Sequence, residues 1–71
     1  MVVGSFKERM EEIRTYRPSE WQDNDAVNVG LSLILSDAAC SHIQRGDLGS
    51  AILCVVEAEW YLDLLRPGRS S

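Results

Sequence analysis

Apolar residues recur along this chain at intervals of three and four, the spacing of amphipathic α-helices. The pattern predicts an all-α fold of three helices, at about residues 6–16, 20–45 or 26–45, and 48–65. Only one or two residues around Gly46 separate the last two helices, so these should run antiparallel as a tight hairpin. The rest of the chain is organised around this hairpin.

The first helix is expected to carry one narrow apolar edge on a charged body. Ser5 and Glu8 have the spacing of a capping box, which predicts a helix start at Phe6. Pro18 should end the helix, because the residue before a proline is driven out of the α region. The apolar edge consists of Phe6, Met10 and Ile13. We expect this edge to cover part of the hairpin.

Two starts are open for the second helix. A second capping-box pattern at residues 19–22 favours a start at Glu20, whereas a cap within the acidic run 23–25 favours a start at Ala26. Trp21 lies in this polar connector. It either folds onto the hairpin as a lid or contacts a partner, since tryptophan is enriched at the centres of protein interfaces.

The second helix has apolar stripes on two different faces. One stripe contains Val27, Leu31, Ile34, Leu35, Ala38 and His42. The other has heptad spacing and contains Val29, Leu33, Ser36, Cys40 and Ile43. We expect the first stripe to close the hairpin and the heptad stripe to lack a partner within the chain. Gly30 costs roughly 1 kcal/mol in a helix relative to alanine, so its expected use is the close approach of another backbone.

The third helix also has two stripes, on nearly opposite sides. Gly46 should end the second helix with a positive φ angle, and Asp47 should cap the third. One stripe contains Leu48, Ala51, Ile52, Val55, Ala58 and Leu62, and the other contains Leu53, Val56, Trp60 and Leu64. A helix that is apolar on almost all sides belongs inside a larger assembly. In a chain of 71 residues this favours dimerisation into a helical bundle.

Length predicts one small domain over residues 1–71, with flexible tails at 1–4 and 67–71. A core of this size supplies only about 3–5 kcal/mol, so small domains often need a disulfide, a metal or a partner chain. The chain has two cysteines and one histidine, too few for a zinc site made of Cys and His. We expect reduced, buried thiols at Cys40 and Cys54, although the hairpin could bring them together as a disulfide.

Charge and hydropathy argue against nucleic-acid binding and against a membrane segment. The net charge of −4, from eleven acidic and seven basic residues, disfavours direct binding to nucleic acid. The longest uncharged run, residues 26–36, is about half of the roughly 20 residues that a membrane span requires, and the first residues lack the features of a signal peptide. We therefore expect a cytoplasmic protein without a membrane segment.

The hairpin resembles a known helical repeat. Gly46-Asp47-Leu48 is followed by Ala51 and Ala58, and Ala39 lies seven residues before the glycine. With this spacing of small residues, residues 35–65 are similar to a single tetratricopeptide-repeat hairpin, or to a hairpin of the helical HEPN domains. The resemblance implies two helices that cross closely at small side chains.

The sequence departs from both families at identifiable positions. Leu48 replaces the usual tyrosine of the tetratricopeptide repeat, Pro67 comes four residues late, and no second repeat is present, although such arrays need about three. HEPN ribonucleases carry an arginine a few residues before a histidine. The nearest arginine before His42 is Arg17, so the resemblance does not extend to that activity.

These observations predict a non-enzymatic protein–protein interaction module, homodimeric, acting as a small adaptor or regulator. No catalytic, cofactor-binding or metal-binding residue is expected. Partner-binding residues are expected at Leu33, Ile43, Leu53, Val56, Trp60, Leu64 and Trp21. The partner is a second copy of the chain, another protein, or both.

Two other functions remain open. One is an acidic inhibitor of a nucleic-acid enzyme, encoded by a virus or mobile element and acting through acids in the first third of the chain: Glu8, Glu11, Glu12, Glu20, Asp23 and Asp25. The other is a helical ligand-binding or metal-binding domain that uses His42 with the acids of the last helix, Glu57, Glu59 and Asp63.

Overall fold

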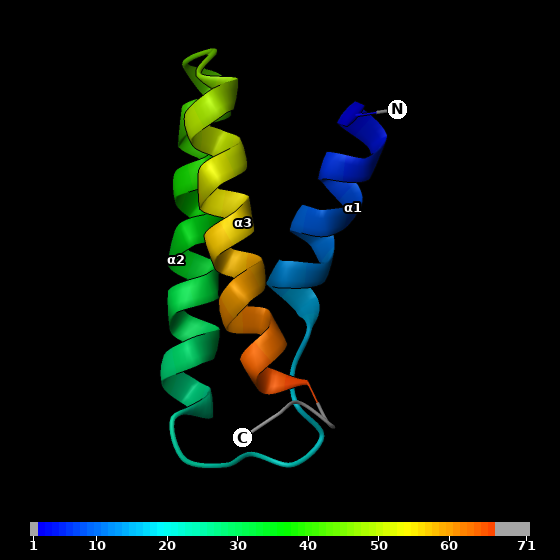
Figure 1. Ribbon diagram of the computed structural model, residues 1–71, viewed down its shortest axis with the longest axis vertical. Helices are drawn as coiled ribbons and strands as arrows, with labels where there is room; N and C mark the ends of the chain where they lie inside the picture. Colours follow the sequence, from blue (N-terminus) through cyan, green and yellow to red (C-terminus); the bar gives the residue numbers. More distant parts are fainter. Residues whose placement is uncertain (1, 67–71) are drawn as a thin grey trace.

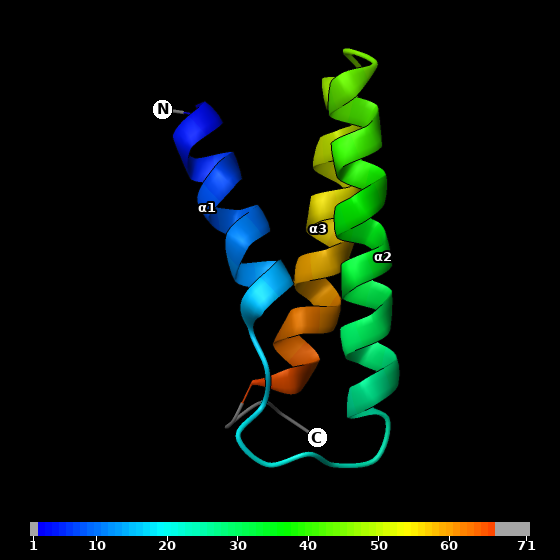
Figure 2. The same cartoon turned by 180° about the vertical axis from the view of Figure 1, so that it is seen from behind.

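Three helices make up the fold (Figure 1). The computed structural model describes the backbone of residues 2–66 and the side chains from residue 6 onward. Its elements are α1 (Val2–Thr15), α2 (Asp25–Gln44) and α3 (Leu48–Leu65). α2 and α3 lie side by side in opposite directions, and α1 lies against one side of this pair (Figures 1 and 2). The predicted all-α fold with a tight hairpin is confirmed.

α1 starts earlier than the capping-box pattern predicts. It begins at Val2, so Ser5 lies inside the helix and the predicted start at Phe6 is wrong. A capping box is a local preference, and a helix that is already nucleated gains one backbone hydrogen bond for each residue it adds. Residues 2–4, predicted as part of a flexible tail, therefore belong to α1. The tail predicted at residues 67–71 lies outside the described residues.

The connector reaches α2 through a turn held by Asp25. The backbone N–H of Gln22 donates to Asp25 Oδ2 at 2.7 Å, and the N–H of Asp25 donates to the carbonyl of Gln22 at 3.1 Å. Asn24 has a φ of 73°, a left-handed conformation that breaks any helix starting at Glu20. The later of the two predicted starts is therefore realised. Trp21 remains 55% exposed in this connector, so the interpretation of Trp21 as a lid is wrong.

The hairpin turn has the predicted stop and cap. Gly46 has a φ of 79°, its N–H donates to Ile43 O at 2.9 Å, and the N–H of Asp47 donates to His42 O at 2.8 Å. These two bonds form a Schellman motif. Asp47 then accepts a hydrogen bond from the Ser50 N–H at 3.1 Å, which caps α3.

Small side chains close the seam of the hairpin. Ala39 of α2 and Ala51 and Ala58 of α3 are completely buried. Val55 and Leu62 are buried beside them on α3, as predicted for the first stripe of this helix, while α1 adds Met10 and Ile13. The core is therefore a close helix pair with a third helix laid over one side of it.

In α2 the two stripes have the opposite roles from those predicted. Val29 and Ser36 of the heptad stripe are buried, whereas Val27 and Ile34 of the other stripe are exposed. The reason is that this face packs mainly against α3, and α1 also reaches it, where the Ser36 hydroxyl lies 4.0 Å from the Met10 sulfur. The expectation that the heptad stripe lacks a partner within the chain is wrong.

Two residue-level predictions on α2 and α3 also have clear outcomes. A Cβ added at Gly30 would meet nothing within 4 Å, so the chain itself makes no close backbone approach there. Cys40 and Cys54 are both free and half-buried, so the disulfide alternative is not realised.

The fold is one-sided. Its radius of gyration is 12.4 Å, compared with about 11 Å expected for a compact domain of this length. α1 meets the hairpin near its own C-terminal end and diverges from it toward its N-terminus (Figures 1 and 2). Much of the surface of the hairpin is consequently left without a covering helix.

Candidate protein-binding surface

Exposed apolar side chains gather on one side of α3. Nine large apolar residues with described side chains are exposed, and five of them lie on this helix. We call these five the α3 strip: Leu48, Ile52, Leu53, Val56 and Trp60. Their exposed fractions lie between 42% and 68%. The strip runs from the hairpin turn to Trp60, about three turns of helix.

The strip follows from the periodicity of α3. Ala51, Val55, Ala58 and Leu62 recur at intervals of four, three and four, and they occupy the face that α2 and α1 cover. The members of the strip lie on the adjoining face. Because α1 diverges from the hairpin toward its N-terminus, it leaves the half of α3 nearest the turn uncovered (Figure 1).

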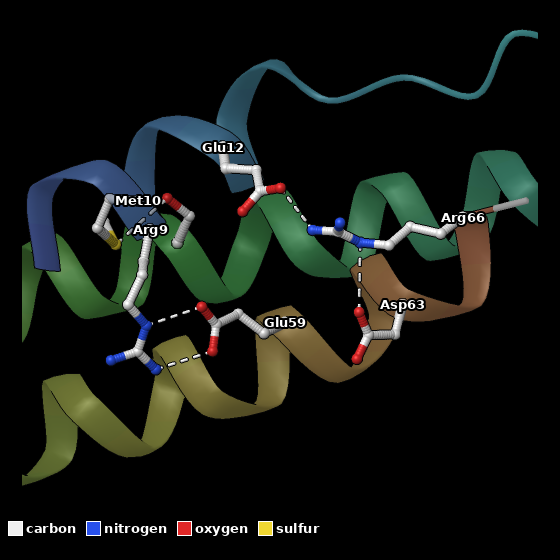
Figure 3. Close-up of polar contacts among 7 residues, drawn as sticks. Arg9, Met10, Glu12, Glu59, Asp63 and Arg66 are labelled. Carbon is white, nitrogen blue, oxygen red and sulfur yellow. Dashed lines mark hydrogen bonds and ion pairs between the residues drawn. The ribbon is translucent and has the colours of Figure 1, made fainter. Parts of the chain in front are cut away.

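Ion pairs hold α1 to α3 along one border of the strip. Arg9 donates two hydrogen bonds to Glu59, both 2.8 Å long, from Nε and Nη2 (Figure 3). Hydrogen bonding from Arg9 lowers the pKa of Glu59, against the opposing effect of burial, and the same pair raises the pKa of Arg9. The carboxylate that borders the strip on this side is thus neutralised by a guanidinium.

A second ionic cluster lies at the end of α3. Arg66 binds Glu12 of α1 and, through Nε, Asp63 of α3 at 3.3 Å (Figure 3). Tyr16 lies under the Arg66 guanidinium, 5.6 Å from the ring centroid. Glu57, on the other border of the strip, makes no ion pair with any residue in the described part of the chain. The strip is therefore an apolar surface with the paired carboxylate of Glu59 on one border and Glu57, which has no ion pair in the described part of the chain, on the other.

The structure brings together three of the seven predicted partner-binding residues. Leu53, Val56 and Trp60 lie in the strip, and Leu64 is half-buried one turn beyond it. Leu33 packs against the core, Ile43 borders a groove beside α1, and Trp21 is exposed on the connector.

Leu48 and Ile52 belong to the strip. The sequence pattern places both in the stripe that closes the hairpin, and for these two residues that prediction is wrong. The signal that could have separated them is the regular spacing of Ala51, Val55 and Ala58, which forms a complete buried face without them.

A groove lies between α1 and α2. It has a volume of about 270 Å³ and apolar walls formed by Phe6, Met10, Cys40 and Ile43, with Lys7, Glu11 and Arg14 at its rim. Ligand pockets usually occupy about 300–1,000 Å³. The volume of the groove lies just below this range.

His42 lies in the last turn of α2 and contacts residues of the hairpin turn. Its Nδ1 lies 2.8 Å from Arg45 Nη2 and 3.8 Å from Asp47 Oδ2, and hydrogen bonds from Ser50 lower the pKa of the Asp47 carboxyl. No hydrogen bond in the described residues joins His42 to Ser41 or Cys40. Its polar contacts are those of a turn residue.

The acidic residues of the first third of the chain are divided among α1, the connector and the start of α2. Asp25 is buried, Glu12 is bound to Arg66, and the exposed acids Glu8 and Glu20 lie on different elements. Among residues 6–66, no group of three His, Cys, Asp or Glu side chains is placed to hold a metal ion.

By length and composition α2 is apolar enough to cross a membrane. Core helices of soluble proteins and signal sequences pass the same test, so this property by itself assigns α2 to none of these classes.

Comparison with known proteins supplies no relative. No protein-family model, curated protein or solved structure matches the chain. The residues that resemble tetratricopeptide-repeat and HEPN hairpins lie in the turn at Gly46 and among the buried alanines of the seam, Ala39, Ala51 and Ala58.

Proposed function

We propose that this protein is a small, non-enzymatic interaction module that binds a protein chain through the α3 strip and acts as an adaptor or regulator. The strip is the observation that carries the proposal. Its five large apolar side chains are each between 42% and 68% exposed. The largest exposed apolar patch of a soluble protein is often a functional surface.

The thin core supports the same proposal. α1 contributes two buried apolar side chains, Met10 and Ile13, and the seam of the hairpin is built largely from alanine. A domain this small gains only a few kcal/mol from its own core, so burial of the strip against a partner would add substantially to its stability.

The test compares two substitutions on equally exposed leucine and isoleucine side chains. Leu53 in the strip is 68% exposed and Ile34 on α2 is 65% exposed. In a pull-down from host cells, the tagged full-length chain should capture partner proteins, including a second copy of the chain that carries a different tag. We expect the Leu53→Glu variant to lose these proteins. Ile34→Glu should retain them. Circular dichroism establishes that both variants are folded, and identical sets of retained proteins for all three chains would overturn the proposal.

A further inference from the structure

Gly49 is a helical glycine that the fold of the chain does not require. Its φ is not positive, and a Cβ added there would meet only Asp47 Oδ1, at 3.9 Å, which is an ordinary contact. Gly49 is the second residue of α3, and glycine is less favourable than alanine in a helix, by about 1 kcal/mol at interior positions. The position differs from Gly30, the other helical glycine without close neighbours, because it lies in line with the α3 strip.

Gly49, Leu53, Val56 and Trp60 follow one another at intervals of four, three and four. This is the alternation of d and a positions in a coiled coil. When two copies of such a helix pair antiparallel, each a position of one copy faces a d position of the other. One register then sets Trp60 against Gly49 of the second copy and Leu53 against Val56 of the second copy, and the two-fold axis repeats both contacts.

We infer that the α3 strip binds a second copy of this chain in this antiparallel register, with each Trp60 packed over the Gly49 of the other copy. This rests on the proposed function and specifies its partner. The volumes match in each layer, because the largest side chain faces a glycine and two medium side chains face each other. A parallel pair would oppose two tryptophans in one layer and leave a void between two glycines in another, and packed interfaces tolerate neither.

The charges beside the strip permit the same register. Glu57 comes to lie near Ser50 of the second copy, and the two Glu57 side chains are offset along the axis by about five residues, or roughly 7 Å. Glu59, on the other border, is already paired with Arg9. No like charges are therefore forced together in this register.

The small size of the strip indicates a weak dimer. Each copy supplies five side chains, whereas a standard interface of 1,200–2,000 Å² has about 20–30 residues on each side. The dimer should therefore be reversible, like other small transient interfaces.

The register is tested by changing the sizes of the two side chains that should face each other. Sedimentation equilibrium of the full chain, from about 10 µM to 1 mM, measures how strongly each variant dimerises. Gly49→Leu sets a leucine against Trp60, and Trp60→Ala leaves a cavity over Gly49, so each variant alone should dimerise at least about tenfold more weakly than the wild type. Mixing the two variants allows a heterodimer. In it, Trp60 of one variant faces Gly49 of the other, as in the wild type, and the introduced leucine faces the introduced alanine. The mixture should therefore associate more strongly than either component, and so should the double variant Gly49→Leu/Trp60→Ala relative to each single one.

Gly30→Ala is the matched control, and it should dimerise like the wild type. Far-ultraviolet circular dichroism checks that each variant is folded, and the double variant keeps the test decisive if Gly49→Leu alone does not fold. Single variants that self-associate like the wild type, or a mixture no stronger than its components, would overturn the register. A wild-type chain that stays monomeric at 1 mM would overturn self-association. In that case the proposed function would still be supported if the wild type captured host proteins and Leu53→Glu did not.

Discussion

Glu59 ties two helices together with a single carboxylate. It accepts two hydrogen bonds from Arg9, which lies fifty residues away in the chain, and roughly a third of each side chain is exposed. Exposed ion pairs contribute about 0.2–1 kcal/mol, with paired, two-point geometry toward the upper end. No periodicity in the sequence marks this pair, because Arg9 and Glu59 are two among many charged residues on solvated faces.

The pH dependence of stability should report this pair. Arg9 lowers the pKa of Glu59 below its ordinary value of 4.5, so the stabilisation is complete above that pH and is lost as the pH falls through the lowered pKa of the folded state. Urea unfolding should therefore show Glu59→Gln to be less stable than the wild type by about 0.5–1 kcal/mol at pH 7. The difference should shrink toward zero as the pH falls below the lowered pKa of Glu59.

Glu57→Gln is the control, since Glu57 has no ion-pair partner in the described part of the chain. It should follow the wild type across the whole pH range. A constant deficit for Glu59→Gln at every pH would show that the ion pair does not stabilise the fold.

At the scale of the helix, glycine has two different roles in this chain. Gly46 ends α2 with a φ of 79°, which an alanine would adopt only with strain, and its N–H completes the Schellman motif. Gly30 lies within α2 with ordinary helical geometry and no atom near its missing Cβ. The same substitution should therefore have opposite effects at these two positions.

Gly30→Ala should stabilise the protein by about 1 kcal/mol, because alanine loses less conformational entropy in the helix and meets no neighbour. Gly46→Ala should destabilise it by about 1–2 kcal/mol through the left-handed conformation. Chemical denaturation at one fixed protein concentration measures both. A destabilised Gly30→Ala variant would mean that something outside the chain approaches α2 at that position.

Across the whole molecule the parts are held with unequal strength. α2 and α3 share a seam of fully buried residues, Ala39, Ala51, Val55 and Ala58. α1 is held by Met10, Ile13 and partly exposed ion pairs, and it diverges from the hairpin toward its N-terminus (Figure 2). Segments with few buried apolar contacts open at a lower free energy than the core.

Hydrogen exchange should therefore show α1 opening before the hairpin. Amides of α1 should exchange faster than those of Val55–Leu62 in α3, and Arg9→Gln should speed exchange in α1 while leaving that segment of α3 nearly unchanged. Equal protection in all three helices, in the wild type and the variant alike, would mean that the molecule opens as one cooperative unit.

The turn and α3 could be read from the sequence because their determinants are local. Gly46 and Asp47 specify a helix stop and a helix cap through their own backbone and side-chain chemistry, and α3 spans residues 48–65 as predicted. The exposure of Leu53, Val56 and Trp60 was also predicted, because the apolar residues of this helix lie on two nearly opposite sides and only one side can close the hairpin.

The tertiary structure decided which side of α2 is inside. Both of its stripes are apolar, so the periodicity supports either orientation, and only the packing against α3 and α1 selects the face that contains Val29 and Ser36. The Arg9–Glu59 pair and the exposure of Trp21 likewise depend on where α1 and the connector lie. The sequence by itself determined the helices, their stop and cap, and the seam of small residues, because these depend on neighbours along the chain. The choice of covered face depends on contacts between residues far apart in the chain, which a local pattern does not contain.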